Sequence, residues 1–159
     1  MYAERLEELI RAEIEPVLSA MGFTVVELSA GQRKGVTHVV VVLHRPEGVG
    51  VDQCAEATRA IQPRLALVEG LGELTLEVSS PGIERILKSP AEYAIFKGRG
   101  LRVLPAEGGE WIGGLIEGSE GGTLRLRTPQ GVREFPHGSI RRARLDYRLD
   151  APGNDRTNR

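Results

Sequence analysis

Residues 76–88 read Leu-Glu-Val-Ser-Ser-Pro-Gly-Ile-Glu-Arg-Ile-Leu-Lys, and a regular strand pattern ends in this stretch. The pattern begins at Glu73 and alternates apolar with polar side chains, which is typical of a half-buried strand. Pro81 and Gly82 then fit the two central positions of a type II turn, because proline fixes φ and glycine accepts a positive φ. The stretch therefore predicts a strand that ends in a sharp turn.

Such a turn places polar side chains beyond the end of the strand. Ser79, Ser80 and Arg85 would project there, where hydroxyls and a guanidinium can bind the backbone or phosphates of a partner. We therefore take Ser79, Ser80, Pro81, Gly82 and Arg85 as candidate partner-binding residues. The structural alternative is that the turn only redirects the chain toward a second domain and that Arg85 pairs with a local carboxylate.

The residues before the motif predict an N-terminal two-layer α/β domain over residues 1–88, in the order α-β-β-α-β. Amphipathic and valine-rich patterns carry this prediction. The expected elements are a helix that ends near Gly22, strands at 23–29 and 36–44 joined by a loop at 30–35, a helix capped by Asp52 with Cys54, Ala57, Ile61 and Leu65 facing inward, and a strand at 73–79.

After the motif, the sequence pattern changes to that of a short helix followed by short strands. Residues 89–98 are expected to form a linker helix and hinge, since a proline at the first helical position follows a serine with capping-box spacing. Short apolar stretches separated by glycine, proline or charge predict a small β-barrel over residues 99–149, with a bulge or bend at Gly113-Gly114. Residues 150–159 offer nothing to bury and are expected to be disordered. The fold class predicted overall is α+β.

Charge is distributed unevenly around a net value of −1. Residues up to Lys97 carry 10 basic and 14 acidic side chains, whereas the later residues carry 11 and 8, and all 11 are arginines. So small a net charge argues against a protein that wraps nucleic acid by bulk electrostatics. The cationic part of the chain is its C-terminal third.

Arginines in that third follow strand periodicity. Arg125 and Arg127 alternate with leucines, and Arg142, Arg144 and Arg148 share the outward phase of a last strand in which Ala143, Leu145 and Tyr147 face inward. These two arginine stripes can bind phosphates or acidic side chains. The alternative is an ordinary solvated surface, partly neutralised by Glu117, Glu134 and Asp146 and poor in aromatic stacking platforms.

Catalytic and cofactor sites are not predicted. His38, His44 and His137 are scattered, and Cys54, the only cysteine, lies on the apolar stripe of a helix, so neither a metal site nor a thiol nucleophile is expected. A hydrolase or transferase is therefore disfavoured. The longest apolar run, Val39–Leu43, is too short to span a membrane and no basic-then-apolar leader is visible, so a cytoplasmic protein is expected.

The central motif resembles the RimP ribosome maturation family. The similarity rests on Glu77-Val78-Ser79-Ser80-Pro81-Gly82 with Arg85 and Leu87, and on a linker helix with Pro90, Tyr93, Phe96 and Gly98. Weaker similarity covers Met21-Gly22-Phe23, Val51-Asp52-Gln53-Cys54 and Ile140-Arg141-Arg142-Ala143-Arg144-Leu145. Ile83, Glu84 and Ile86 depart from the leucine, aspartate and proline common in the family, which is expected to alter the backbone after the turn slightly.

This resemblance implies a fold and a role. The barrel would be Sm-like or SH3-like, and the protein would bind the small (30S) ribosomal subunit during maturation. Its partners would be 16S rRNA and the ribosomal protein numbered twelve in that subunit, without catalysis or cofactor, and a monomer is expected. The alternative function is an Sm-like RNA-binding regulator that acts on free RNA, which would bind isolated RNA strongly and lose affinity steeply with salt.

Overall fold

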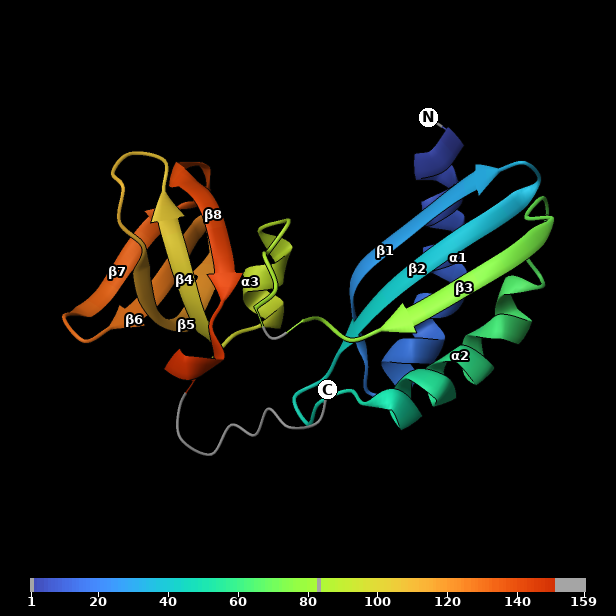
Figure 1. The fold of residues 1–159 in the computed structure, drawn as a ribbon, viewed down its shortest axis with the longest axis horizontal. Helices are drawn as coiled ribbons and strands as arrows, with labels where there is room; N and C mark the ends of the chain where they lie inside the picture. Colours follow the sequence, from blue (N-terminus) through green and yellow to red (C-terminus); the bar gives the residue numbers. More distant parts are fainter. Residues whose placement is uncertain (1, 83, 151–159) are drawn as a thin grey trace. The chain divides into compact units, whose positions relative to one another are not determined.

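The computed structural model describes residues 2–82 and 84–150 (Figure 1). These residues form two compact units that divide between Pro81 and Gly82. The first unit combines helices with a three-stranded sheet, and the second is built around a separate five-stranded sheet, which confirms the α+β class. None of the helices in the described part of the chain is both long enough and apolar enough to cross a membrane.

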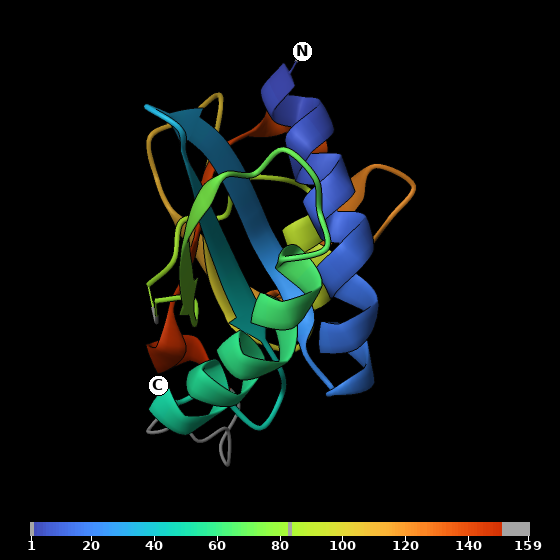
Figure 2. The ribbon, with the colours of Figure 1, turned by 90° about the vertical axis from the view of Figure 1, so that its right-hand side faces the viewer.

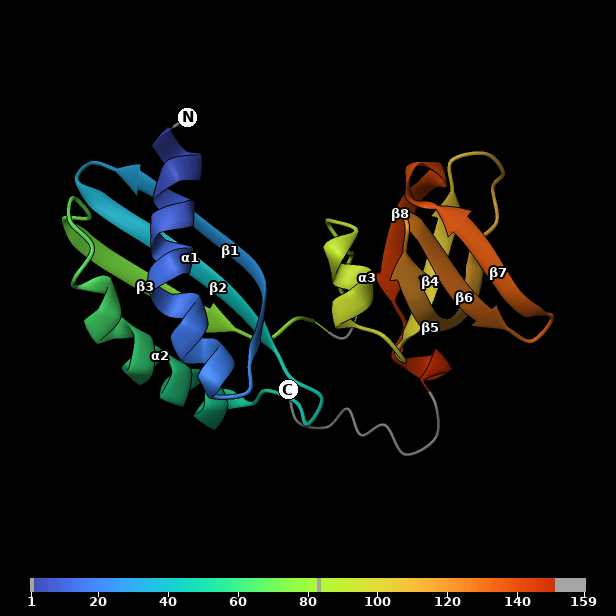
Figure 3. The ribbon, with the colours of Figure 1, turned by 180° about the vertical axis from the view of Figure 1, so that it is seen from behind.

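The N-terminal unit has the predicted α-β-β-α-β order. Its elements are α1 (Tyr2–Ala20), β1 (Thr24–Arg33), β2 (Val36–His44), α2 (Val51–Leu65) and β3 (Glu73–Ser79). The sheet order is β1-β2-β3, with β1 antiparallel and β3 parallel to β2. Both helices lie on one face of this sheet (Figures 2 and 3), so its other face is not covered by a helix of the unit.

The core of this unit lies between the helices and the central strand. Val39, Val41 and Leu43 of β2 are buried, and they face Ile10 of α1 and Ile61 of α2 within one apolar cluster. Full burial of an aliphatic side chain contributes roughly 1.5–3 kcal/mol. The period-two pattern of β2 therefore determines which face of the sheet is inside, and the predicted inward stripe of α2 is confirmed for Ala57, Ile61 and Leu65.

The hairpin between β1 and β2 is tighter than predicted. Instead of a loop at 30–35, β1 continues to Arg33, and only Lys34 and Gly35 connect the strands, with φ of 54° and 80°. A two-residue turn with both φ positive matches the twist of antiparallel strands, so the ladder can extend to its end. The side-chain amide of Gln32 also donates to Thr37 Oγ1 (2.9 Å) and to the Gly70 carbonyl (2.8 Å), which fixes this end of β1.

The start of α2 also differs from the prediction. Gly50 is the N-cap, and its backbone N–H donates to Oε1 of Gln53 at 2.8 Å. Asp52 lies inside the first turn, where its carboxylate favours the positive end of the helix dipole without accepting a capping hydrogen bond. The prediction of Asp52 as the cap was wrong by two residues, because glutamine at the third helical position supplies the reciprocal contact.

The C-terminal unit contains short helices and an antiparallel sheet. Its elements are α3 (Ala91–Ile95), β4 (Gly100–Pro105), β5 (Ile112–Glu120), β6 (Thr123–Thr128), β7 (Gly131–Pro136), the 3-10 helix η1 (His137–Ser139), β8 (Ile140–Leu145) and the 3-10 helix η2 (Tyr147–Leu149). The sheet order is β7-β6-β5-β4-β8, and within the described residues β7 and β8 do not pair, so the sheet is open (Figure 1).

The prediction of a bulge or bend at Gly113-Gly114 was wrong. Gly113 and Gly114 pair regularly with Arg102 and Leu101, and the irregularities lie between Leu104 and Pro105 and between Ile116 and Gly118. At Gly114 a Cβ would collide with the carbonyl of Arg127. The two glycines are therefore explained by close packing on β5 and not by a bend.

The last strand is also shorter than predicted. β8 ends at Leu145, and Tyr147 and Arg148 belong to η2, where Tyr147 is exposed and does not face inward. The Asp146 carboxylate accepts from the Arg148 backbone N–H (3.0 Å) and so caps η2. Asp150, which had been assigned to the tail, accepts from the Gly100 backbone N–H (2.7 Å), and the predicted disorder of residues 151–159 lies outside the described residues.

A pair of glycines tests the packing between the α2–β3 connection and the hairpin. Gly70 and Gly72 both have positive φ, but only at Gly72 would a Cβ meet backbone, 2.6 Å from the Gly35 oxygen. We expect Gly70→Ala to lower the free energy of unfolding by about 1 kcal/mol and Gly72→Ala by about 2–4 kcal/mol. Chemical denaturation followed by far-UV circular dichroism measures both, and equal losses would contradict the close approach.

Candidate functional site

The candidate motif begins at the end of β3. Ser79 pairs with Val42 of β2, Ser80 and Pro81 are half-buried, and Gly82 is exposed. The backbone N–H of Arg85 donates to the Gly82 carbonyl at 3.2 Å, so the turn hydrogen bond forms after Gly82. The φ of Gly82 is not in the left-handed region and a Cβ there would meet nothing within 4 Å. The predicted type II turn with a positive φ at Gly82 was therefore wrong. Gly82 is the first residue of the hydrogen-bonded turn and not its third.

Arg85 forms a buried ion pair. Its Nε lies 2.7 Å from Oε1 of Glu92, and the two side chains are only 9% and 3% exposed. The second oxygen of Glu92 accepts from the Lys88 backbone N–H at 2.9 Å. Arg85 is thus held by a local carboxylate, as the structural alternative proposed, and Glu92 serves this contact and not a capping box.

The segment that contains Arg85 also extends the C-terminal sheet. The Leu87 backbone N–H donates to the Ala143 carbonyl, and the Leu145 N–H donates to the Arg85 carbonyl, both at 2.9 Å. Ile86 thereby forms an antiparallel bridge with Arg144. Residues 85–87 cover the free edge of β8, which would otherwise expose unpaired backbone groups.

The arginine stripes lie on one face of the C-terminal sheet. Arg144 pairs with Arg102, Arg102 pairs with Gly113, and Arg127 pairs with Leu115, two residues further along β5 than Gly113. Directly paired residues, and residues two apart on a strand, share a face. The outward face therefore carries the predicted Arg125, Arg127, Arg142 and Arg144, together with Arg102.

The sequence analysis missed Arg102, although the alternation Leu101-Arg102-Val103 indicates the same outward phase. Leu101 and Val103 are fully buried, whereas Arg102 is half-buried. The pattern of β4 alone does not indicate a binding surface, because a single outward arginine makes no stripe along its own strand. Only the pairing of β4 with β8 and β5 brings it into the arginine surface.

Local contacts neutralise part of this face. Nε of Arg127 donates to Oε2 of Glu117 at 2.8 Å, as the solvated-surface alternative predicted. The Arg144 guanidinium lies 5.5 Å from the centre of the Trp111 ring, a cation–π contact. Arg142 is exposed. On this face, therefore, Arg127 and Arg144 make local contacts, whereas Arg142 is exposed to solvent.

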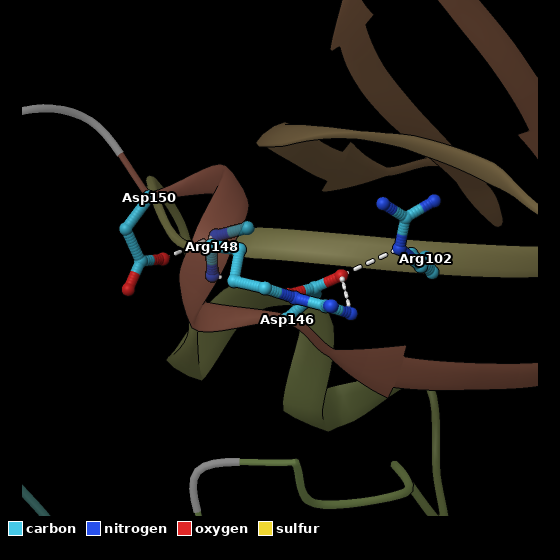
Figure 4. A network of polar contacts seen from close by, with 5 residues as sticks. Arg102, Asp146, Arg148 and Asp150 are labelled. Carbon is cyan, nitrogen blue, oxygen red and sulfur yellow. Dashed lines mark hydrogen bonds and ion pairs between the residues drawn. The ribbon is translucent and has the colours of Figure 1, made fainter.

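Asp146 lies at the end of this surface where β8 is followed by η2 (Figure 4). Its side chain is 3% exposed, and it accepts from Nε of Arg102 at 2.5 Å and from Nε of Arg148 at 3.0 Å. The hydrogen bond from the Arg148 side chain, followed by that from Arg102, holds the pKa of Asp146 at about 2, below its ordinary value of 3.8, against the opposing effect of burial. Asp146 therefore stays ionised and orients Arg102.

Groups suited to catalysis are few. Ser119 Oγ and His137 Nε2 lie 2.8 Å apart, and the His137 ring packs 5.3 Å from the ring of Tyr93, but within residues 2–82 and 84–150 no acid is seen to orient the imidazole. Burial raises the pKa of the Cys54 thiol, which disfavours the reactive thiolate. The described residues also contain no group of histidine, cysteine or carboxylate side chains that could hold a metal ion.

The Arg85–Glu92 pair can be tested by a double-mutant cycle. Breaking a buried pair costs roughly 3–5 kcal/mol, because one charge stays buried without its partner. We expect Arg85→Met to destabilise the C-terminal unit by that amount, and Arg85→Met with Glu92→Gln to recover part of the loss. Denaturation followed by the fluorescence of Trp111, the only tryptophan, measures this. Additive effects would show that the two residues are not coupled.

Asp146 gives the unit a defined acid dependence. Its pKa is lower in the folded than in the unfolded chain, so its stabilisation is complete above about pH 4 and is lost as the pH falls toward about 2. We expect Asp146→Asn to cost roughly 1–3 kcal/mol at neutral pH. The difference from the parent protein should shrink below about pH 4. Denaturation curves across this range measure it, and a pH-independent difference would contradict the assignment.

A comparison with known protein families bears on the N-terminal unit. Residues 13–84 match the family model described as the RimP N-terminal domain. The match begins within α1, continues through β3 and ends inside the candidate motif. It confirms the family resemblance of the sequence over these residues, so the N-terminal unit is a RimP N-terminal domain.

Proposed function

We propose that this chain binds the small (30S) ribosomal subunit during its maturation and assists assembly without catalysis. The match of residues 13–84 to the RimP N-terminal domain carries the proposal, because that family implies a role in ribosome maturation. Such a factor would act by differential binding, favouring one conformation of an immature subunit.

The uncovered face of the N-terminal sheet suits a basic partner. Glu77 pairs with Val40 of β2, which pairs with Ser29 of β1. Glu73 lies four residues before Glu77 on β3 and therefore on the same face of the sheet. Both glutamates are exposed. Arg33 lies in the same row as Glu73 and offsets its charge, so the acidic part of this face is centred on Glu77. An acidic site beside apolar side chains fits a basic ribosomal protein, and the family resemblance suggests the one numbered twelve in the small subunit.

The arginine face of the C-terminal sheet suits 16S rRNA. Its guanidinium groups can bind phosphates in a directed way. We propose that this open five-stranded sheet is a variant of the Sm-like barrel expected from the sequence. A linker helix at 89–98, a monomeric state and a cytoplasmic location, where ribosomes are assembled, belong to the same proposal. The expected boundaries 1–88 and 99–149 are replaced by a division between Pro81 and Gly82, because residues 85–87 pair with β8 of the C-terminal unit.

The alternative is an Sm-like regulator that acts on free RNA. The gathering of five arginines on one face favours it. Against it stand the acidic N-terminal sheet face and the pairing of Arg127 with Glu117, which reduce attraction to a polyanion. The Arg144 guanidinium lies over the Trp111 ring, which limits base stacking on the one tryptophan of the chain.

Co-sedimentation separates the two functions. The purified chain is mixed with free small subunits, free large subunits and assembled ribosomes over a series of salt concentrations. We expect preferential recovery with free small subunits and a modest loss with salt, because the net charge is only −1. Equal recovery with all three, or a strong preference for protein-free RNA, would favour the regulator.

A charge reversal tests the acidic sheet face. We expect Glu77→Lys to weaken binding to small subunits by roughly tenfold, as a buried interfacial contact of 1.4 kcal/mol would. Glu56→Lys is the matched control, since Glu56 is exposed on α2, which covers the opposite face of the sheet. Equal losses for the two variants would show that only the net charge of the unit matters.

A further inference from the structure

A hollow of about 380 Å³ lies on the arginine face of the C-terminal sheet. Its lining consists of Arg102, Gly113, Gly114, Leu115, Arg127, Thr128, Pro129 and Leu149. Because Gly113 carries no side chain, β5 offers a low floor between the arginines of β4 and β6. We propose that this hollow binds one nucleotide unit of single-stranded RNA, with its phosphate between Arg102 and Arg127.

Strand geometry brings the two arginines within reach of one phosphate. β4 and β6 lie on either side of β5, about 10 Å apart at the usual strand spacing. Arg102 is opposite Gly113 and Arg127 is opposite Leu115, on the same face. Arg102 already reaches over Gly113, and Arg127, whose Nε and Nη2 lie 2.8 Å from Glu117, can reach the same anion through its other terminal nitrogen.

The orientation of Arg102 supports this placement. Its Nε is engaged by Asp146, and Figure 4 shows its two terminal nitrogens directed away from that carboxylate. One of these nitrogens, Nη1, lies 3.3 Å from the position that a Cβ on Gly113 would occupy, so it reaches over the floor of the hollow. The buried carboxylate thus fixes the guanidinium while leaving its terminal donors for a ligand.

The remaining lining favours a nucleotide over an acidic side chain. Leu115, Pro129 and Leu149 provide apolar surface beside the two cations. A ribose and base can cover this surface while the phosphate lies between the arginines, whereas a short carboxylate would leave it exposed to water. The volume is also in the range of a small-ligand site.

The experiment measures binding of a fluorescently labelled oligouridylate to the full chain by anisotropy. We expect Arg127→Gln to weaken binding roughly five- to tenfold and to lower the salt slope by about one phosphate contact. Gly113→Val should weaken it as much without changing the charge, since its Cβ would lie 2.9 Å from Leu149 Cδ1 and fill the hollow. Thermal melting confirms that each variant is folded.

Arg141→Gln is the matched control, because Arg141 is exposed on β8 outside the hollow. We expect it to change RNA affinity less than about twofold. The proposal is overturned if Arg127→Gln and Arg141→Gln weaken binding equally, if Gly113→Val has no effect, if the parent chain does not bind the oligouridylate, or if a polyglutamate peptide binds the hollow as tightly.

The nucleotide site rests on the proposed function for its biological setting, but the two can be refuted by different results. Loss of RNA binding with intact co-sedimentation on small subunits would refute the nucleotide site and leave the maturation role standing. Oligouridylate binding that depends on Arg127 and Gly113, combined with equal recovery on all ribosomal particles, would refute the maturation role and keep the site.

Discussion

The buried carboxylate of Glu92 holds the C-terminal unit's first segment in place. One oxygen accepts from the Arg85 side chain and the other from the Lys88 backbone, so both ends of the segment are tied to α3. Removing a carboxylate and a guanidinium from water is costly and is offset only by hydrogen bonds of good geometry. Because Arg85 is held there, its carbonyl and the Leu87 N–H can continue the ladder of β8. Residues 85–87 of the family motif therefore form the edge of the C-terminal sheet.

The two sheets present different chemistry on their open faces. In the N-terminal unit the helices cover one face, and the other carries Glu73 and Glu77 with Arg33, His38 and smaller side chains. In the C-terminal unit the outward face carries the arginines. A net charge of −1 thus conceals two surfaces of opposite sign, each suited to a different component of a ribonucleoprotein. This division is the physical basis for proposing a protein partner for one sheet and an RNA partner for the other.

Elements with strong periodicity could be predicted from the sequence, whereas contacts between elements could not. The alternation in β3 and the leucine–arginine alternation in β6 each define a buried face, and both predictions were confirmed. The cap at Gly50, the short hairpin turn at Lys34 and the conformation of Gly82 depend on single hydrogen bonds or local φ values, which composition does not specify. The role of Glu92 was missed because its spacing fits a capping box as well as an ion pair.

Asp146 shows why the number of arginines is a poor guide to nucleic-acid affinity. This buried carboxylate engages Arg102 and Arg148, and Glu117 engages Arg127, so much of the local positive charge is balanced at short range. Long-range attraction of a polyanion is reduced accordingly, since it depends on the net field. At Arg102 short-range hydrogen bonding is retained, because its terminal nitrogens point away from Asp146. A nucleotide bound at the proposed site would therefore be selected by the geometry of its phosphate and not by the net charge of the surface.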